Sequence, residues 1–350
     1  MNLQLRINGT APAWPVFLEH PSAFYDSSDI PALGSVSYSL IAYTDKSCTT
    51  VEWEILIDAG HNAVPFLLNH GNRIPDAIFL THAHPDHMLG IDWIVQSHHF
   101  KYRNTGKKMP VYCTRLAWDM LMGTYAYIEP HVRLVELLPG QKQCIEEAPG
   151  LCVTPFPVFH GKGALGASML YFEPPGSDTK NLLITADMLC PLLRKKDIST
   201  INDAGILFID TNNRFPYPES NHTSFARKAG SEEEINIRLQ QWFKKTTIPD
   251  LLTPHWVNGN NGQINFYFEE FLSDWKHISD IPHTILDFLE IVPVQEVFLI
   301  HYFGIYDEIN YNEKVLDALQ LQKWAGDLLK QSGLEKIHIK VPKSADTLFL

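Results

Sequence analysis

Short apolar runs that end in polar or turn residues recur along most of the chain. Most of them are rich in β-branched and aromatic residues and are bounded by Gly, Pro, Asp or Asn, which is typical of β-strands. The predicted strands cover residues 3–7, 35–43, 53–60, 76–84, 109–114, 132–138, 151–161, 167–174, 181–188, 204–212, 296–304, 336–342 and 346–350. The pattern therefore predicts a chain in which strands outnumber helices.

Helical periodicity is confined to three regions. Residues 91–100 (IDWIVQSHHF) read as an amphipathic helix, and residues 231–293 as a mostly helical insertion. Residues 312–333 form a third helical pattern, which Asn312 is placed to cap and Gly333 to stop. Strands with interspersed helices predict an α/β layered fold with mixed sheets. We expect one domain over residues 1–350 that carries the 231–293 insertion.

The charge balance disfavours large nucleic acids as partners. Lys and Arg number 28 against 40 Asp and Glu, which gives a net charge of −12, and such a surface repels a phosphate backbone. No apolar run approaches the length of a membrane span, and the N-terminus lacks the apolar segment of a secretory signal. The five cysteines are scattered without a CxxC pair, so we expect reduced thiols and a cytoplasmic protein.

Ligand-type side chains are concentrated in one stretch, LTHAHPDHMLG, at residues 80–90. In an extended segment His82 and His84 point to the same side, and the turn at Pro85 can bring Asp86 and His87 to a neighbouring position. Imidazole nitrogens and carboxylate oxygens are ligands that Zn²⁺ favours. The stretch therefore predicts a metal site at a strand end.

Further ligand types follow at the ends of other predicted strands. These are Asp58 after EILI, His160 after FPVF, Asp187 after LLITA and His301 after VFLI. A single histidine or aspartate in such a place is more often structural than functional. Together with the histidine cluster, however, the four supply enough ligands for two metal ions.

In this order the residues resemble the five motifs of the metallo-β-lactamase superfamily. The resemblance implies an αββα sandwich, with two mixed β-sheets flanked by helices and the metal site at their joined edges. It implies one metal ion bound by His82, His84 and His160, and another bound by Asp86, His87 and His301. Asp187 would bridge the two ions, and Asp58 would hold a ligand histidine in the required tautomer.

Two positions indicate which metal and which chemistry to expect. Histidine at 84, where the iron-dependent branch of the superfamily typically has glutamate, favours a Zn²⁺ hydrolase. Asp187 stands where the β-lactam-hydrolysing enzymes tend to have cysteine, and Mn²⁺ is compatible with the resulting nitrogen and oxygen ligands. The resemblance implies that two such ions would supply an activated water for attack on a phosphorus atom, while Asp86 would steer its proton.

Other stretches resemble the phosphodiesterase branch, namely ribonuclease Z and the phosphoribosyl cyclic phosphate phosphodiesterases. The most informative are FIDTNNRF and NHTS, which place Asp210 and His222 where ribonuclease Z has an acidic residue and a histidine that act together at the scissile phosphate. The resemblance implies that His222, held by Asp210, donates a proton to the leaving alkoxide. The motif departs from the family at Ile209, which replaces a histidine, and a solvated loop histidine is the alternative for His222.

The basic arm with which ribonuclease Z grips tRNA has no counterpart in this sequence. We therefore expect a small phosphodiester as substrate, with cyclic ones among the candidates. Two other functions stay open: hydrolysis of a lactone or thioester, and a non-catalytic metal-binding accessory protein in biosynthesis. The aromatic residues of the 231–293 insertion indicate either a small helical core or a cap or homodimer contact, and in the latter case His255 would reach the site.

Overall fold

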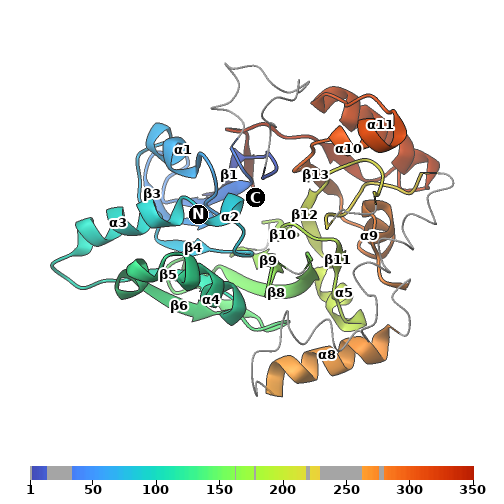
Figure 1. The fold of residues 1–350 in the computed structure, drawn as a ribbon. Helices are drawn as coiled ribbons and strands as arrows, with labels where there is room; N and C mark the ends of the chain where they lie inside the picture. Colours follow the sequence, from blue (N-terminus) through green and yellow to red (C-terminus); the bar gives the residue numbers. More distant parts are fainter. Residues whose placement is uncertain are drawn as a thin grey trace.

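The computed structural model describes residues 2–13, 34–161, 163–176, 179–217, 221–228, 262–275 and 280–350. In this part of the chain two mixed β-sheets pack face to face, and helices cover their outer faces (Figure 1). The predicted α/β sandwich is therefore confirmed.

The first sheet contains the first and the last strand of the chain, which pair with each other. Its strand order is β15-β1-β2-β3-β4-β5-β6, antiparallel from β15 to β3 and parallel from β3 to β6. The strands are β1 (Asn2–Gly9), β2 (Ser37–Tyr43), β3 (Val51–Ile57), β4 (Ala77–Phe79), β5 (Met109–Cys113), β6 (Val132–Glu136) and β15 (Thr347–Phe349).

The second sheet has the order β11-β8-β9-β10-β12-β13-β14, with β7 also paired to β8. It is antiparallel from β11 to β10 and parallel from β10 to β14. The strands are β7 (Gln143–Cys144), β8 (Cys152–Phe159), β9 (Ser168–Glu173), β10 (Asn181–Ile184), β11 (Cys190–Pro191), β12 (Ala204–Asp210), β13 (Glu296–Ile300) and β14 (His338–Lys340).

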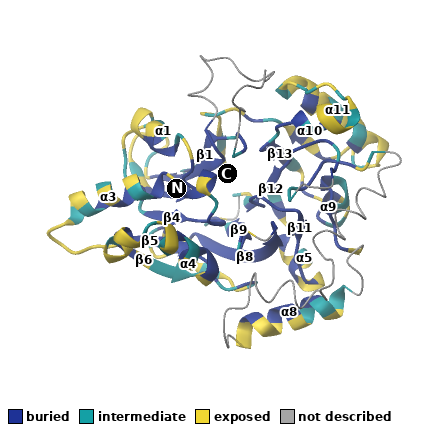
Figure 2. Cartoon of the chain, viewed as in Figure 1, coloured by how far each residue is buried: buried dark blue, intermediate teal, exposed yellow. Residues whose placement is uncertain are grey.

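The strands are buried on both faces because each sheet is covered twice. Along β12, Ile206 and Phe208 enter the core between the sheets, whereas Leu207 and Ile209 face the outer helices. This alternation is what a period of two residues requires, and it explains why the strand reads as an unbroken apolar run. Figure 2 shows most of the strands buried, with β6 partly exposed and many exposed residues on the outer helices.

Each sheet has its own helical cover. Helices α1, α3 and α4 pack on the first sheet, and α9 and α11 pack on the second. The helices are α1 (Ala63–Asn69), α2 (Pro85–Met88), α3 (Ile91–Tyr102), α4 (Arg115–Thr124), α5 (Lys195–Ile201), α8 (Gly262–Asp274), α9 (Ile285–Ile291), α10 (Ile305–Tyr311) and α11 (Ala318–Gln331), with a 3₁₀ helix at Ala126–His131. None of these described helices is long and apolar enough to span a membrane.

The predicted start of the last long helix was wrong. Asn312 does not cap it but ends α10 in the left-handed conformation, with φ at 53°. The cap of α11 is Asp317, five residues later, which accepts from the backbone of Gln320, while the Gln320 side chain accepts from the backbone of Asp317. This capping box is a stronger start signal than a lone asparagine. The predicted stop holds, since Gly333 follows the helix with φ at 74°.

The expectation that every cysteine is reduced was also wrong. Cys144 in β7 and Cys152 in β8 are directly opposite each other in the antiparallel pair, and they form a disulfide. The remaining three cysteines, Cys48, Cys113 and Cys190, are free thiols. Spacing alone does not reveal a cross-strand pair of this kind, because the register that brings the two residues together is a tertiary property.

The described part of the 231–293 insertion is helical and packs on the sandwich. Tyr267, Phe268 and Phe271 of α8 are buried against Phe159 and Leu189. These three aromatic residues are part of a core shared with the sandwich, and a cap or homodimer contact stays a prediction for the rest of the insertion. His255, and residues 231–261 as a whole, lie outside the described residues.

A buried ion pair crosses the antiparallel strands of the first sheet. The Arg6 guanidinium lies 2.9 Å from Glu54, and it also donates to the Ser39 hydroxyl at 3.0 Å. The Arg6 side chain is 9 % exposed and that of Glu54 3 %, so neither charge can be solvated by water. Each charge therefore depends on the other.

Replacing Arg6 with methionine is expected to lower the free energy of unfolding by about 3–5 kcal/mol, because Glu54 would remain buried without a cation. Urea unfolding measures the change. The double variant Arg6→Met/Glu54→Met should recover much of the loss. As a control, Lys142→Met breaks an exposed pair with Glu173 and should cost no more than about 1 kcal/mol. An equal cost for Arg6→Met and the control would contradict the prediction.

Candidate metal centre

The predicted ligands gather where strands of both sheets end at a common edge. Asp58 follows β3, His82 and His84 follow β4, and Asp86 and His87 lie in the one-turn helix α2. From the second sheet, His160 follows β8, Asp187 follows β10, and His301 follows β13. Residues far apart in the sequence thus meet because the carboxyl ends of parallel strands lie side by side.

Three backbone positions at this edge adopt the left-handed conformation. Asp58, Ala186 and His301 have φ of 56°, 56° and 64°. This conformation costs of order 1–3 kcal/mol for a residue other than glycine, and it persists only where the surrounding structure imposes it. Glycine is required at Gly60, since a Cβ there would lie 1.4 Å from the Asp86 carbonyl oxygen. The loop after β3 therefore fits closely against the histidine motif.

One group of ligand atoms consists of three imidazole nitrogens. His84 Nδ1 lies 3.1 Å from His82 Nε2 and 3.2 Å from His160 Nε2. Ligands about 2.0–2.1 Å from one tetrahedral ion are separated by about 3.3 Å. The three nitrogens therefore have the mutual spacing of atoms that surround one ion.

A second group combines carboxylates with two histidines. His87 Nε2 lies 3.3 Å from both Asp86 Oδ2 and Asp187 Oδ2, and His301 Nε2 lies 3.4 Å from Asp187 Oδ2. The same Asp187 oxygen is 3.7 Å from His160 Nε2 of the first group. Asp187 thus stands between the two groups, which is where a bridging ligand would be placed.

The two histidine nitrogens of the second group are placed to bind a metal ion and do not form hydrogen bonds with the neighbouring side chains. His87 Nε2 and His301 Nε2 are buried and make no hydrogen bond, a costly state for a polar atom that has no other partner. In the described part of the chain, His82, His84 and His160 form one possible metal-holding group, and Asp86, His87, Asp187 and His301 form another. A third possible group, of Asp187, Asp210, His222 and His301, shares two residues with the second. The residues present therefore fit two divalent ions.

The two groups differ in charge. Burial lowers the pKa of His160 to about 3, and it also lowers the pKa values of His82 and His84, so these imidazoles are neutral. Burial opposes charge on His301 as well, but the neighbouring carboxylates, Asp187 foremost, raise its pKa to about 10. The carboxylates therefore create a potential that attracts cations, and a metal ion binding there must displace protons.

Asp58 contacts His87, one of the predicted ligand histidines. Asp58 Oδ2 lies 2.8 Å from His87 Nδ1, and the carboxylate accepts from the backbone N–H of Thr81 at 2.8 Å and from its hydroxyl at 2.7 Å. These bonds fix the rotamer of Asp58, and with it the orientation of the His87 ring. A ligand histidine commonly has such a carboxylate partner on its other nitrogen.

The structure also brings Asp210 and His222 to the centre. His222 Nδ1 lies 2.8 Å from Asp210 Oδ2, and the His222 ring is 4.7 Å from that of His160 and 4.9 Å from that of His301, centroid to centroid. The His222 side chain is 13 % exposed, whereas Asp210 is fully buried. His222 therefore lies beside both ligand groups and is not an isolated surface histidine.

Three contacts at the centre were not foreseen from the sequence. Asp210 Oδ1 lies 3.3 Å from His301 Nδ1, Thr81 anchors Asp58, and the Asn221 carbonyl oxygen is 3.1 Å from His160 Nδ1. A signal existed for the first contact, because Asp210 and His301 stand at the ends of neighbouring parallel strands. The other two depend on loop conformation, for which the sequence has no pattern.

Comparison with known proteins agrees with this geometry. The family described as beta-lactamase superfamily domain matches residues 54–179, which include the histidine motif and His160. No curated protein matches the sequence.

Among solved structures, a diphosphatase from the PhnP family has 16 % identity and a TM-score of 0.58, over 100 % of this chain and 98 % of the other. The metallo-beta-lactamase fold protein YhfI from Bacillus subtilis has 13 % identity and a TM-score of 0.54, over the full length of both chains. A long form RNase Z from yeast has 11 % identity and a TM-score of 0.51, over 99 % of this chain and 41 % of the other.

At these identities the solved structures show a common fold and nothing more. The family match adds the motif sequence itself, and the donor atoms of that motif converge as the ligands of metal-dependent hydrolases do. Residues 54–179 therefore match the beta-lactamase superfamily domain, and the described chain has the metallo-β-lactamase fold.

Proposed function

We propose that this protein is a binuclear metal-dependent phosphodiesterase that acts on a small phosphodiester, cyclic phosphodiesters included. The observation that carries the proposal is the placement of His222, which lies beside both ligand groups and is held by the buried Asp210 carboxylate. A histidine that is oriented by a carboxylate and lies next to the predicted ligand residues is suited to transfer a proton at the reacting centre.

Two divalent ions bound here, with Zn²⁺ favoured and Mn²⁺ compatible, would supply an activated water and neutralise charge on phosphate oxygens. The chain contributes the rest of the chemistry. The Asp86 side chain is only 6 % exposed and faces both His87 and His301, so its second oxygen can direct the proton of the attacking water. The Asp210 carboxylate holds the His222 ring through Nδ1, which makes Nε2 the nitrogen that transfers the proton.

A proton donor in this position is most valuable for a phosphodiester. An alkoxide is a poor leaving group, and its departure requires protonation as the bond to phosphorus breaks. A positioned general acid contributes about 10²–10⁴-fold to such a step. An ordinary thioester needs less, because a thiolate leaves without a proton, and the placement of His222 therefore supports phosphodiester cleavage over thioester hydrolysis.

Two further facts support a small phosphorus-containing substrate. Proteins described as a diphosphatase and as an RNase Z share this fold. The net charge of −12 works against a polyanionic polymer, because affinity for nucleic acid depends on neutralising many phosphates with Lys and Arg. A small substrate presents only one or two charges, which two bound metal ions would neutralise.

The first prediction concerns metal content. Protein purified without chelator should contain close to two transition-metal ions per chain by elemental analysis, since the donor atoms form one group of three histidines and a second group around Asp187 and His301. His84→Ala and Asp187→Ala should each abolish turnover and lower the metal content, whereas His338→Ala, at an exposed histidine of β14, should change neither. Near-normal activity in either ligand variant, or at most traces of metal with no activation by Zn²⁺ or Mn²⁺, would contradict the assignment.

The second prediction concerns the size of the substrate. The protein should not bind tRNA precursors at physiological ionic strength, because an acidic chain gains little from counterion release. Fluorescence anisotropy with labelled tRNA at about 150 mM salt, where exposed charges are screened beyond about 8 Å, is a direct measurement. Submicromolar binding under these conditions would show that the substrate is a polymer.

The third prediction separates the role of His222 from that of the metal ligands. His222→Ala should lose about 10²–10⁴-fold in kcat on an alkyl or ribose phosphodiester, but far less on bis-p-nitrophenyl phosphate, whose leaving group needs no proton. Asp210→Asn should combine a weaker form of this asymmetry with a loss on both substrates, because Asp210 also contacts the ligand His301.

The outcomes of this comparison are distinct. Equal losses on both substrates with His222→Ala would mean that His222 binds phosphate or supports the fold, and no loss on either would make it an ordinary loop histidine. If a lactone or thioester is hydrolysed faster than every phosphodiester and His222 is dispensable, the protein is an acyl hydrolase. An absence of turnover on all substrates at full metal content would favour the accessory-protein alternative.

A further inference from the structure

A row of five buried polar side chains crosses the outer face of the first sheet. Arg6 and Asn8 lie on β1, Ser37 and Ser39 on β2, and Glu54 on β3. Their neighbours along each strand enter the core between the two sheets, as the alternation of side chains in a strand requires. Because water does not reach the side chains of the row, their polar atoms need partners inside the protein.

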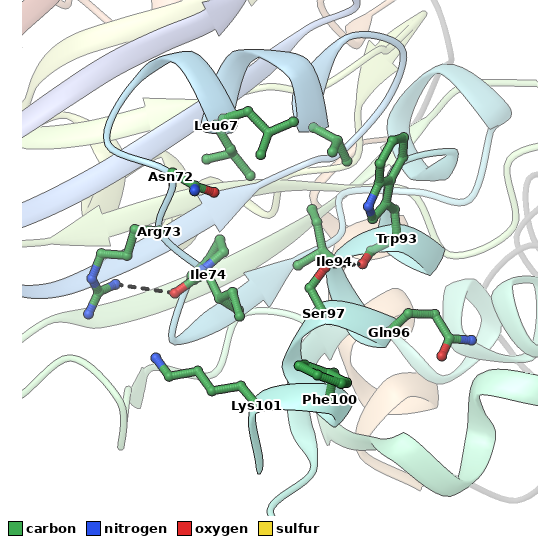
Figure 3. A pocket seen from close by; sticks show the side chains of 13 residues that line it. Leu67, Asn72, Arg73, Ile74, Trp93, Ile94, Gln96, Ser97, Phe100 and Lys101 are labelled. Carbon is green, nitrogen blue, oxygen red and sulfur yellow. Dashed lines mark hydrogen bonds between the residues drawn. The ribbon is translucent and has the colours of Figure 1, made fainter. Parts of the chain in front are cut away.

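Helix α1 covers this row. Arg6 Nη1 donates to the His70 carbonyl oxygen at the end of α1 at 3.2 Å, and the guanidinium lies 5.8 Å from the centre of the Phe66 ring. The groove between α1 and α3, which Figure 3 shows, is a separate feature, because none of the described residues that line it belongs to the row. The function of the row therefore lies in what it contacts within the chain.

The hydrogen bonds of the row run in one direction. Arg6 Nε donates to Asn8 Oδ1 at 3.2 Å, and a guanidinium can only donate. The NH₂ group of Asn8 therefore points the other way, where it donates to Ser37 Oγ at 3.3 Å and to Ser39 Oγ at 3.1 Å. A hydroxyl that accepts from one partner keeps its single hydrogen for another, and Ser37 donates to the Asp58 carbonyl oxygen at 2.8 Å. The row thus ends at Asp58 of the metal centre.

A β-bulge in β1 places Asn8 within reach of both serines. Ile7 pairs with Tyr38, and Gly9 pairs with Ser37. Two steps along β1 thus correspond to one step along β2, which makes Asn8 the extra residue of the bulge. Bulges redirect side chains and are frequent beside functional sites. The irregularity therefore supports a role for the Asn8 and Ser37 contact beyond the pairing of two strands.

Asp58 has a backbone conformation that needs such support. Its φ of 56° lies in the left-handed region, which a residue with a side chain keeps only where its surroundings impose it. The Asp58 N–H donates to the Phe79 carbonyl oxygen at 2.8 Å, and this bond holds the residue at the end of β3. The Ser37 hydroxyl holds the peptide group that follows, where the left-handed turn leaves the strand. The two bonds together fix the turn from both sides.

We propose, on the basis of the two-metal centre of the proposed function, that Ser37 is a positioning residue that acts through Asp58 on the ligand His87. The Ser37 hydroxyl holds the turn at Asp58, and the Asp58 carboxylate holds His87 through Nδ1 at 2.8 Å. His87 Nε2 is thereby presented to the second group of donor atoms. The three-histidine group is connected less directly, since His82 Nδ1 faces the Thr81 hydroxyl at 3.2 Å. Loss of the Ser37 bond therefore affects the second group most.

Competition between the zinc-loaded protein and a chelator measures how tightly each ion is held. Ser37→Ala should weaken Zn²⁺ binding by the second group about tenfold, the lower end of the range for residues that orient a ligand without binding the metal. Binding by the three-histidine group should weaken less. His84→Ala and His301→Ala, each of which removes a ligand from one group, show which binding step belongs to which group.

Ser39→Ala is the matched control. It removes an equally buried hydroxyl from the same row, one that accepts from Arg6 and Asn8 and lies two residues further from the Asp58 end of β2. Thermal melting at saturating Zn²⁺ should show that the two variants lose stability to a similar extent, whereas only Ser37→Ala should lose affinity in the second group. A purely structural role predicts instead that affinity falls with stability in both variants alike.

Ser37→Thr keeps the hydroxyl and should hold Zn²⁺ more tightly than Ser37→Ala. Three results would overturn the role of Ser37. They are an unchanged affinity in Ser37→Ala, an equal loss of affinity in Ser39→Ala, and a Ser37→Thr variant that melts like the unsubstituted chain yet binds Zn²⁺ as weakly as Ser37→Ala.

The measurement of affinity separates this role from the proposed reaction. If two ions bind and respond to Ser37→Ala as expected, but no phosphodiester is cleaved, the phosphodiesterase function fails and the role of Ser37 stands. If two ions bind but do not respond, the role of Ser37 fails and the phosphodiesterase function is unaffected. If neither group binds Zn²⁺, both are wrong.

Discussion

The constraint on which the rest of the structure depends is the burial of several carboxylates in one place. Asp58, Asp86, Asp187 and Asp210 are all buried at the edge where the two sheets meet. Such a concentration of negative charge is tolerated only with cations among it. Imidazoles provide part of the compensation, as the raised pKa of His301 indicates, and two divalent ions would provide the remainder. The edge of the sandwich therefore attracts cations, and the strand ends hold its carboxylates in place.

Much of this centre could be predicted from the sequence, because histidines and aspartates that directly follow apolar strands are costly to bury unless they bind something. The pattern alone places Asp58, the histidine motif, His160, Asp187 and His301 at strand ends. The parts that escaped prediction depend on tertiary register or loop shape. Examples are the contact of Asp210 with His301, the disulfide between Cys144 and Cys152, and the support of Asp58 by Thr81. Helix α11 shows a different limit, since the helix begins at the capping box of Asp317 and Gln320 and not at Asn312, the predicted cap.

Asp210 connects two functions that the sequence suggested were separate. One oxygen faces His222 and the other faces His301, so a single carboxylate orients both the proposed proton donor and a predicted metal ligand. If one imidazole moves, Asp210 shifts with it, and the position of the other imidazole changes as well. The proton-transfer machinery and the metal centre therefore form one coupled network, and residues in it are not expected to act additively.

The parallel register of β12 and β13 sets how this protein can change over evolutionary time. Asp210 pairs with Ile300, and His301 follows at once. Because side chains alternate between the two faces of a strand, a slip of one residue in either strand would turn its polar end residue away from the site and its apolar residues out of their cores. Length changes are consequently confined to loops and to segments outside the strands. The reaction can diversify by varying those segments, while the spacing within each strand stays invariant for as long as the centre is used.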